Sequence, residues 1–135
     1  DILLGAVNAL LEAKDGTIWM GMSGQRMGLC RLAEQAPKDG EILSRCYSQK
    51  DGLPSAWINS LRQTSDGTIW AGTAAGAVRF RPDFSGDKPD FEVFRGGEGV
   101  CDRDVLDLSE DHDGNLWISS GCGATKFQRN GRSFQ

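Results

Sequence analysis

The sequence predicts an all-β fold built from about three copies of a four-stranded antiparallel unit. The pentapeptide Asp-Gly-Thr-Ile-Trp occurs at 15–19 and again at 66–70, and it returns as Asp-Gly-Asn-Leu-Trp at 113–117. The tryptophans that end these copies are 51 and then 47 residues apart, a period that suits one blade of a β-propeller. The chain also has 18 glycines in 135 residues, which is consistent with many tight turns.

The inner strand of each predicted blade is marked by hydrophobic residues at the same two offsets before the tryptophan: Val7 and Leu10, Ile58 and Leu61, Val105 and Leu108. A hairpin turn follows in each copy, because glycine adopts positive φ at little cost and aspartate accepts hydrogen bonds from nearby backbone amides. The turn residues are Asp15 and Gly16, Asp66 and Gly67, and Asp113 and Gly114.

Second strands are expected at 18–22, 69–73 and 116–120. Each is apolar on both sides of the pleat, as in a sheet packed between two neighbouring blades. Third strands are expected at 29–32, 77–81 and 124–128, and outer strands at about 43–48 and 91–94. Residues 7–14 alone resemble a short helix, but the repeat favours a strand.

The chain is therefore expected to form a single propeller segment over 1–135, with blades at about 1–50, 51–98 and 99–135. The last blade is expected to be truncated, because its outer strand begins only at Phe134 and Gln135. Propellers close with roughly four to eight blades, so we expect a fragment of a longer array or a ring completed by a second copy of the chain. Open ends of a blade stack expose apolar surface.

Composition disfavours several functions. The formal net charge is -4 and basic residues do not cluster, which argues against nucleic-acid binding. No apolar run approaches the roughly 18 residues that span a bilayer, so membrane attachment is expected only through a longer parent protein, of which this chain, starting at Asp1, reads as a piece. The four cysteines show no Cys-x-x-Cys pair and no nearby histidine, so neither a metal nor a cofactor is expected.

The motifs over 59–80, namely Asn-x-Leu, Asp-Gly-Thr-Ile-Trp, Gly-Thr and Gly-x-x-Arg-Phe, resemble the two-component regulator propeller repeat. The Asp-Gly-Leu-Pro segment at 51–54 resembles it too. The resemblance implies a large propeller ahead of a membrane helix and a histidine kinase or regulator output domain, on the periplasmic or extracellular side of a bacterial membrane protein. The chain departs from the motif at 21–22 and 119–120, where Gly-Met and Ser-Ser replace Gly-Thr, and in a longer turn at 25–28.

The repeated tryptophans Trp19, Trp70 and Trp117 are interpreted as core residues that fill the same slot between blades. Trp57 differs, because its equivalents in the other blades are Ala6 and Asp104. We expect it in the connection from an outer strand to the next inner strand, on the face that carries the second turn of each blade. Candidate ligand-binding residues on this face are Trp57, Gln25, Arg26, Arg103 and Asp104.

An indole beside an arginine and a carboxylate suits a carbohydrate or another small polar ligand, whereas a tryptophan half-buried against the next blade is the alternative. The segment 111–114 resembles the start of a calcium loop, but a capped hairpin turn explains it better, because the spaced oxygen ligands and the distal glutamate are absent. His112 is the only histidine, and no nucleophile lies at a recognisable spacing from it, which argues against a catalytic triad.

Two cysteine pairs have spacings suited to cross-strand contact. Cys30 and Cys46 flank the turn between the third and outer strands of the first blade, and Cys101 and Cys122 flank the Asp113 hairpin. Either pair could form a disulfide if the domain is extracytoplasmic, and four small buried thiols are the alternative.

The leading functional hypothesis is a non-catalytic extracytoplasmic sensor module that binds a ligand or partner through loops on one face. The alternatives are a scaffold or dimerisation module and, less favoured, part of a propeller lyase or glycosidase whose carboxylates lie on several blades.

Overall fold

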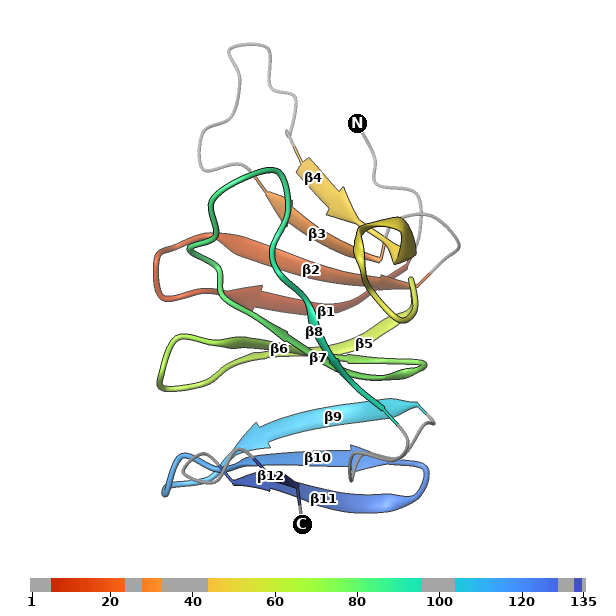
Figure 1. Ribbon diagram of the computed structural model, residues 1–135, viewed down its shortest axis with the longest axis vertical. Helices are drawn as coiled ribbons and strands as arrows, with labels where there is room; N and C mark the ends of the chain where they lie inside the picture. The colour runs from red at the N-terminus through yellow and green to blue at the C-terminus, as the bar shows by residue number, and fades with distance from the viewer. Residues whose placement is uncertain (1–5, 24–27, 33–43, 96–103, 129–132, 135) are drawn as a thin grey trace.

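The computed structural model describes residues 6–23, 28–32, 44–95, 104–128 and 133–134. They form three four-stranded antiparallel sheets, each with its strands side by side in chain order. The sheets are stacked in sequence, the first at the top of Figure 1 and the third at the bottom. This arrangement agrees with the predicted all-β fold of propeller blades.

Each sheet follows the same path from an inner to an outer strand. The first contains β1 (Ala6–Glu12), β2 (Ile18–Ser23), β3 (Leu29–Leu32) and β4 (Ser44–Tyr47). The second follows the short 3-10 helix η1 (Gln49–Asp51) and contains β5 (Ile58–Gln63), β6 (Ile69–Thr73), β7 (Gly76–Phe80) and β8 (Glu92–Phe94). The third contains β9 (Val105–Glu110), β10 (Leu116–Ser120), β11 (Gly123–Gln128) and β12 (Ser133–Phe134).

The region that resembles a short helix is strand β1, so the repeat was the better guide there. In the part of the chain that the structure describes, no helix has the length and hydrophobicity to cross a membrane.

The core lies between the sheets, where aromatic rings of consecutive blades meet. Trp19 is fully buried, with its ring centroid 5.0 Å from that of Phe80 in the next blade. Trp70 repeats the contact one blade later, at 5.1 Å from Phe127. Both tryptophans therefore have the core role that the sequence predicts.

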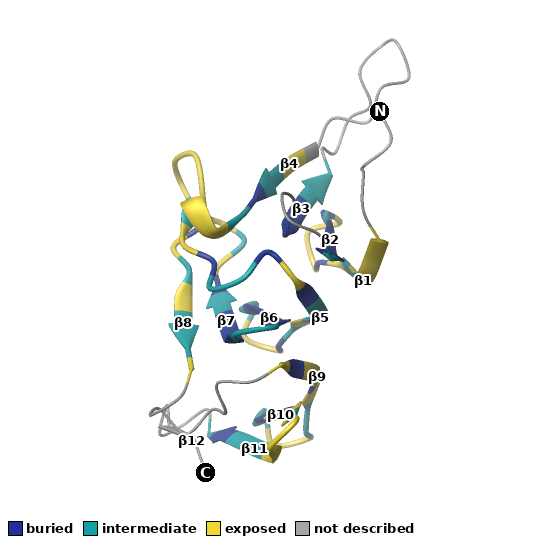
Figure 2. Ribbon diagram, turned by 90° about the vertical axis from the view of Figure 1, so that its right-hand side faces the viewer, coloured by how far each residue is buried: buried dark blue, intermediate teal, exposed yellow. Residues whose placement is uncertain are grey.

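Trp117, unlike Trp19 and Trp70, is not buried among the described residues, so its predicted place between two blades stays a prediction. The residue is 42% exposed, and strand β10 alternates buried and exposed positions, whereas β6 is buried throughout. The reason is that no described segment packs on that side of the third sheet, which is the last of the stack in Figure 1. Strand β1 of the first sheet is mostly exposed and is seen in yellow in Figure 2, whereas β7 of the middle sheet is mostly buried.

A glycine on the second strand allows the next blade to approach closely. A Cβ atom added at Gly21 would lie 2.5 Å from Ile58 Cγ2, and one added at Gly72 would lie 2.6 Å from Val105 Cγ1 and also clash with Ser60 Oγ. Ordinary carbon contacts are about 3.5 to 4 Å. The close packing of β5 and β9 therefore requires glycine on the second strand of the preceding blade, opposite the first hydrophobic residue of the packed strand.

Side-chain amides of two asparagines also hold each later inner strand close to the preceding blade. Asn8 Nδ2 donates to the Ile58 carbonyl oxygen at 3.2 Å, and Asn59 Nδ2 donates to the Val105 carbonyl oxygen at 3.0 Å. These bonds fix the start of one inner strand to the inner strand before it, and β5 and β9 accordingly pack against the first two strands of the preceding blade.

The first blade is also closed covalently. Cys30 and Cys46 face each other on β3 and β4, and a disulfide joins them, with their Cα atoms 4.0 Å apart. Cys122 is disulfide-bonded as well, and its expected partner Cys101 lies outside the described residues.

The exposure difference between equivalent tryptophans predicts unequal mutational costs. Trp19→Ala should lower the free energy of unfolding by about 3 to 5 kcal/mol, because it leaves a cavity between blades. Trp117→Ala should cost only about 1 kcal/mol, since the ring is already partly in water. Urea denaturation of both variants measures the difference, and equal losses would contradict this account of the stack.

The glycine contact predicts a second contrast at matched positions. Gly72→Ala should destabilise the chain by about 1 to 3 kcal/mol, because the added methyl overpacks the contact with Val105. Ser119→Ala, at the equivalent position of the third blade, should change stability by less than about 0.5 kcal/mol. Thermal and chemical denaturation would test this, and a tolerated Gly72→Ala would show that the blades can separate without cost.

Candidate functional site

The predicted ligand-binding face lies at the end of the blades on the right of Figure 1. Trp57 directly precedes β5 and is 50% exposed. Its backbone is fixed on both sides: its N–H donates to Ser55 Oγ at 3.0 Å, and its carbonyl oxygen accepts the Ala74 N–H at 3.0 Å. Trp57 therefore stands beside the β6–β7 turn of its own blade, as expected, on a backbone that does not need a ligand to order it.

Asp104 occupies the equivalent position before β9 and is also exposed. Trp57 and Asp104 thus lie at the same end of neighbouring blades, but no contact between the two side chains is recorded among the described residues. Gln25, Arg26 and Arg103 lie outside the described residues, so the predicted combination of indole, arginine and carboxylate stays a prediction.

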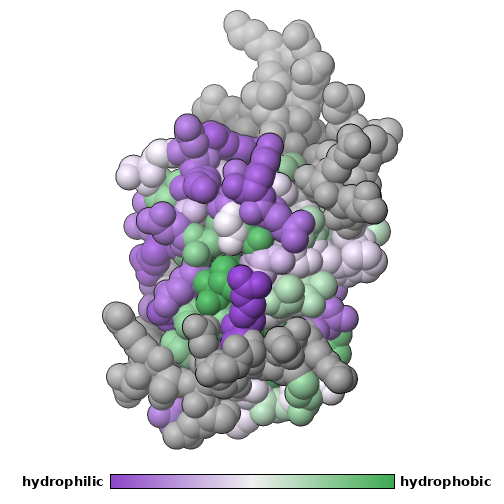
Figure 3. Space-filling model, turned by 45° about the vertical axis from the view of Figure 1, so that its right-hand side comes forward, coloured by the Kyte–Doolittle hydropathy of each residue, from purple (hydrophilic) through white to green (hydrophobic). Residues whose placement is uncertain are grey.

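Gly28 of the first blade lies close to the segment that leads into Trp57. It directly precedes β3 and has a φ of +50°, and a Cβ there would lie 2.6 Å from the Tyr47 carbonyl oxygen and 3.5 Å from Ala56 Cα. The segment that leads into Trp57 therefore packs directly against the first blade. Figure 3, which brings this side forward, shows small hydrophobic areas bordered by hydrophilic ones.

A cavity of about 450 Å³ lies at the opposite end of the blades, between the second and third sheets. It is bordered by hairpin turns and by the ends of β7 and β11, and its lining residues include Asp66, Trp70, Arg79, Arg81, Asp90, Glu92, Gly114 and Phe127. Charged side chains of both signs line it, so it resembles a polar groove more than an apolar binding pocket.

Arg79 is the central basic residue of this groove, and protein groups already engage it. Its Nε lies 2.7 Å from Glu92 Oε2. Its guanidinium carbon lies 5.6 Å from the Trp70 ring centroid, 5.1 Å from that of Phe94 and 5.3 Å from that of Phe127. Such contacts stabilise a buried aromatic cluster, so Arg79 acts as a link between blades.

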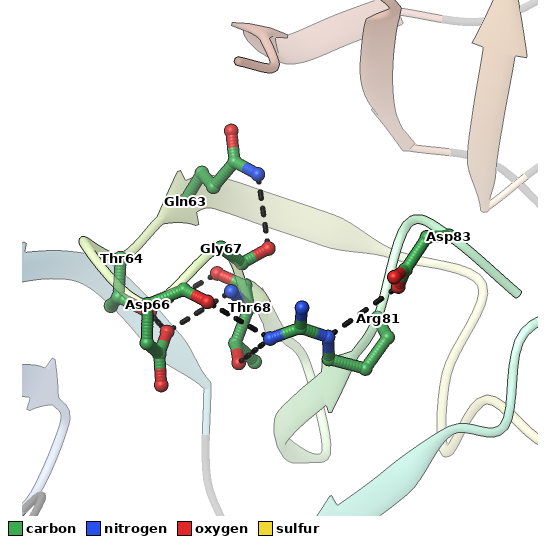
Figure 4. A network of polar contacts seen from close by, with 7 residues as sticks. All are labelled: Gln63, Thr64, Asp66, Gly67, Thr68, Arg81 and Asp83. Carbon is green, nitrogen blue, oxygen red and sulfur yellow. Dashed lines mark hydrogen bonds and ion pairs between the residues drawn. The ribbon is translucent and has the colours of Figure 1, made fainter. Parts of the chain in front are cut away.

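Arg81 is engaged in the same way. Its Nη1 donates to the Asp66 carbonyl oxygen at 2.9 Å, and its Nε lies 3.5 Å from Asp83 Oδ1. Figure 4 shows this network around the hairpin turn, where Asp66 Oδ1 also accepts the Thr68 N–H at 3.0 Å and the Thr64 hydroxyl at 2.6 Å. The repeated aspartate thus supports the turn, and the arginine ties the end of β7 to it.

The basic residue on the third strand is a repeat feature that the motif analysis missed. Arg31, Arg79 and Lys126 pair across the strands with Trp19, Trp70 and Trp117, respectively. Each cation lies between 5.6 and 5.9 Å from the centroid of its partner ring. The available signal was a basic residue nine residues after Trp70 and Trp117, and twelve residues after Trp19, where the first blade has three additional residues.

The turn of the third blade is built differently from the other two. Asp15 and Asp66 accept the N–H two residues later, at 2.9 and 3.0 Å. In the third blade Asp111 has this role: its carboxylate accepts the Asp113 N–H at 3.0 Å, the Asn115 N–H at 2.9 Å and the Trp117 indole N–H at 2.8 Å. The segment is a capped turn, and no cluster of metal-ligating side chains is found in the described ranges.

These bonds lower the pKa of Asp111 to about 2, chiefly through the indole N–H of Trp117 and then through the amides of Asn115 and Asp113. Asp111 is only partly exposed, and its effect is local: it holds the indole N–H of Trp117 on the open face of the third blade.

The chain is similar to known propellers. A family model, the two-component regulator propeller, matches residues 52–75 and 99–121, which confirms the resemblance found in the sequence. No curated protein matches the chain.

Solved structures extend the likeness over almost the whole chain. The extracellular domain of a hybrid two-component system from B. thetaiotaomicron is 27% identical, with a TM-score of 0.75 over 95% of this chain and 16% of that one. The extracellular domain of a one-component system from the same organism is 19% identical, with a TM-score of 0.75 over 94% of this chain and 17% of that one. This chain therefore spans about one sixth of the length of either structure.

A more distant likeness is to virginiamycin B lyase from Staphylococcus aureus, which is 14% identical, with a TM-score of 0.64 over 97% of this chain and 40% of that one. At this identity, as for the one-component system, the likeness shows the fold alone.

The geometry at Asp111 predicts a measurable titration. Because the pKa is depressed, the hydrogen bonds to the carboxylate stabilise the turn above the usual aspartate range and are lost as the pH falls through about 2. Trp117→Phe removes the indole N–H and should raise the pKa of Asp111 toward its ordinary value. NMR titration of the carboxyl carbon tests this, and an unchanged midpoint in the variant would assign the depression to the backbone amides instead.

Proposed function

We propose that this chain, which carries two-component regulator propeller repeats, is a non-catalytic part of an extracytoplasmic sensor domain in a bacterial two-component signalling protein. The observation that carries the proposal is the likeness to the extracellular domain of a hybrid two-component system, which extends over 95% of this chain at 27% identity. A histidine kinase or another output domain would belong to other parts of such a protein.

The cysteines support the proposed compartment. Disulfides persist in oxidising surroundings such as the periplasm and are rare in the cytosol. Cys30 and Cys46 are directly opposed on adjacent strands and bonded to each other, and Cys122 is also disulfide-bonded.

The chemistry of the described residues supports a non-catalytic role. His112 stands on a hairpin turn with 92% of its side chain exposed, and its nearest ionic partner is Asp113 at 3.5 Å. Arg79 and Arg81, which line the groove between blades, already bind protein carboxylates and carbonyl groups. These residues stabilise turns and sheets, and their arrangement lacks the nucleophile and base that covalent catalysis requires.

Ligand binding is proposed at the face that carries Trp57. An exposed indole on a backbone fixed by hydrogen bonds can stack on the apolar face of a sugar ring without a large loss of conformational entropy. Asp104, at the equivalent position of the next blade, adds an exposed carboxylate that can accept hydrogen bonds from hydroxyl groups. The ligand class that fits best is therefore a carbohydrate or another small polar molecule.

Association between blades is the second candidate function. It is favoured by the exposed hydrophobic residues at both ends of the stack, namely Val7 and Leu10 on the first blade and Leu106 and Trp117 on the third. The partner would be further propeller blades. A second copy of the chain is the alternative partner, which the size rule argued in the next subsection disfavours.

Calorimetric titration with neutral and acidic oligosaccharides tests the binding proposal. Trp57→Ala should weaken the binding of a responding oligosaccharide by about tenfold or more, because one stacking contact is lost. Trp57→Phe should retain most of the affinity, and Trp117→Ala, which removes an exposed tryptophan elsewhere, should leave it unchanged. Equal affinity after Trp57→Ala would remove Trp57 from the site, and no response to any oligosaccharide would reject the carbohydrate class.

A further inference from the structure

Each contact between blades joins one position on a second strand to one position on the next inner strand. We name them the slot position (Gly21, Gly72 and Ser119) and the insert position (Val7, Ile58 and Val105). In both contacts within the chain, glycine in the slot faces a β-branched insert residue, and a Cβ in the slot would lie 2.5 or 2.6 Å from a methyl carbon of that residue. The contact is therefore selective for side-chain size.

The third blade breaks this rule on its open face. Ser119 lies two residues after Trp117, as Gly21 and Gly72 lie two residues after their tryptophans, and both Ser119 and Trp117 are exposed. Serine adds the Cβ that the slot excludes, and a hydroxyl group beyond it. A β-branched insert residue would meet that Cβ far inside the normal contact distance of about 3.5 to 4 Å.

A second departure lies beside the first. Asn8 and Asn59 donate their side-chain amides to the carbonyl oxygen of the next insert residue. The equivalent residue of the third blade is Leu106, which is 55% exposed and has no amide to donate. Both parts of the contact that hold consecutive blades within this chain are thus replaced on the same face.

We propose that the open face of the third blade binds an antiparallel β-blade with glycine or alanine at its insert position and rejects a second copy of this chain. A small insert residue lacks the γ carbons that would clash with Ser119, and Leu106 and Trp117 supply apolar contact area. A second copy stacked head to tail would place Val7 against Ser119, and overpacking of that kind costs about 1 to 3 kcal/mol. The inference does not depend on the ligand or on Trp57.

Self-association of engineered chains tests the rule. Ser119→Gly opens the slot, and Val7→Ala shortens the insert residue, so each variant should associate head to tail about tenfold more tightly than the parent chain. Sedimentation equilibrium over a wide range of protein concentrations measures this. Ser109→Gly is the matched control: Ser109 lies opposite Trp117 on the same open face, so it adds a flexible glycine without opening the slot, and no gain is expected.

Val7→Asp in the Ser119→Gly background tests where the chains associate. It should abolish the tighter self-association of Ser119→Gly, because it places a charge in the slot. Equal association of the parent chain and both single variants, at any strength including none, would overturn the proposal. So would a gain that persists with Val7→Asp, since association would then use another surface.

Discussion

The close approach of each inner strand to the second strand of the preceding blade is the constraint on which the rest of the structure depends. It requires glycine at Gly21 and Gly72, and it brings the large rings of Trp19 and Trp70 onto phenylalanines of the next blade. Side-chain contacts at the hairpin end strengthen it, where Gln63 Oε1 accepts the Lys14 N–H at 2.7 Å and Glu110 accepts the Ser65 N–H at 2.9 Å. The stack is thus held at the centre by packing and at its edge by hydrogen bonds.

The opposite end of the blades is the one at which we propose recognition. The β6–β7 turn at that end is ordered by local hydrogen bonds, because the Thr73 hydroxyl donates to the Gly76 carbonyl oxygen at 2.8 Å and accepts the Ala75 N–H at 3.0 Å. Side chains such as Trp57 can therefore vary between blades without disturbing the core. A binding surface built from repeats needs side chains that differ between blades on a backbone that stays the same.

Sequence reasoning located the strands well, because the period and the Asp-Gly turns set their positions independently of what each blade contacts. Strands β6 and β10 begin and end where the repeat placed them. Burial was harder to predict, because it depends on whether a second blade packs on the residue. Trp117 carries the same motif as Trp19, but no described blade covers it. The role of Arg79 was missed for a similar reason, because three rings from two blades surround it. The candidate binding site was predicted only as a face, and of its five residues Trp57 and Asp104 are the two that the structure describes.

The disulfide between Cys30 and Cys46 has a consequence for resistance to proteolysis. It closes a covalent loop around the segment 33–43, so a single protease cut anywhere in that segment leaves both pieces attached to each other. Strand β4 would remain paired with β3, and the contacts of Tyr47 with Phe84 and Phe91 would persist. A single cut in this segment would therefore leave the strand pairing of the first blade in place.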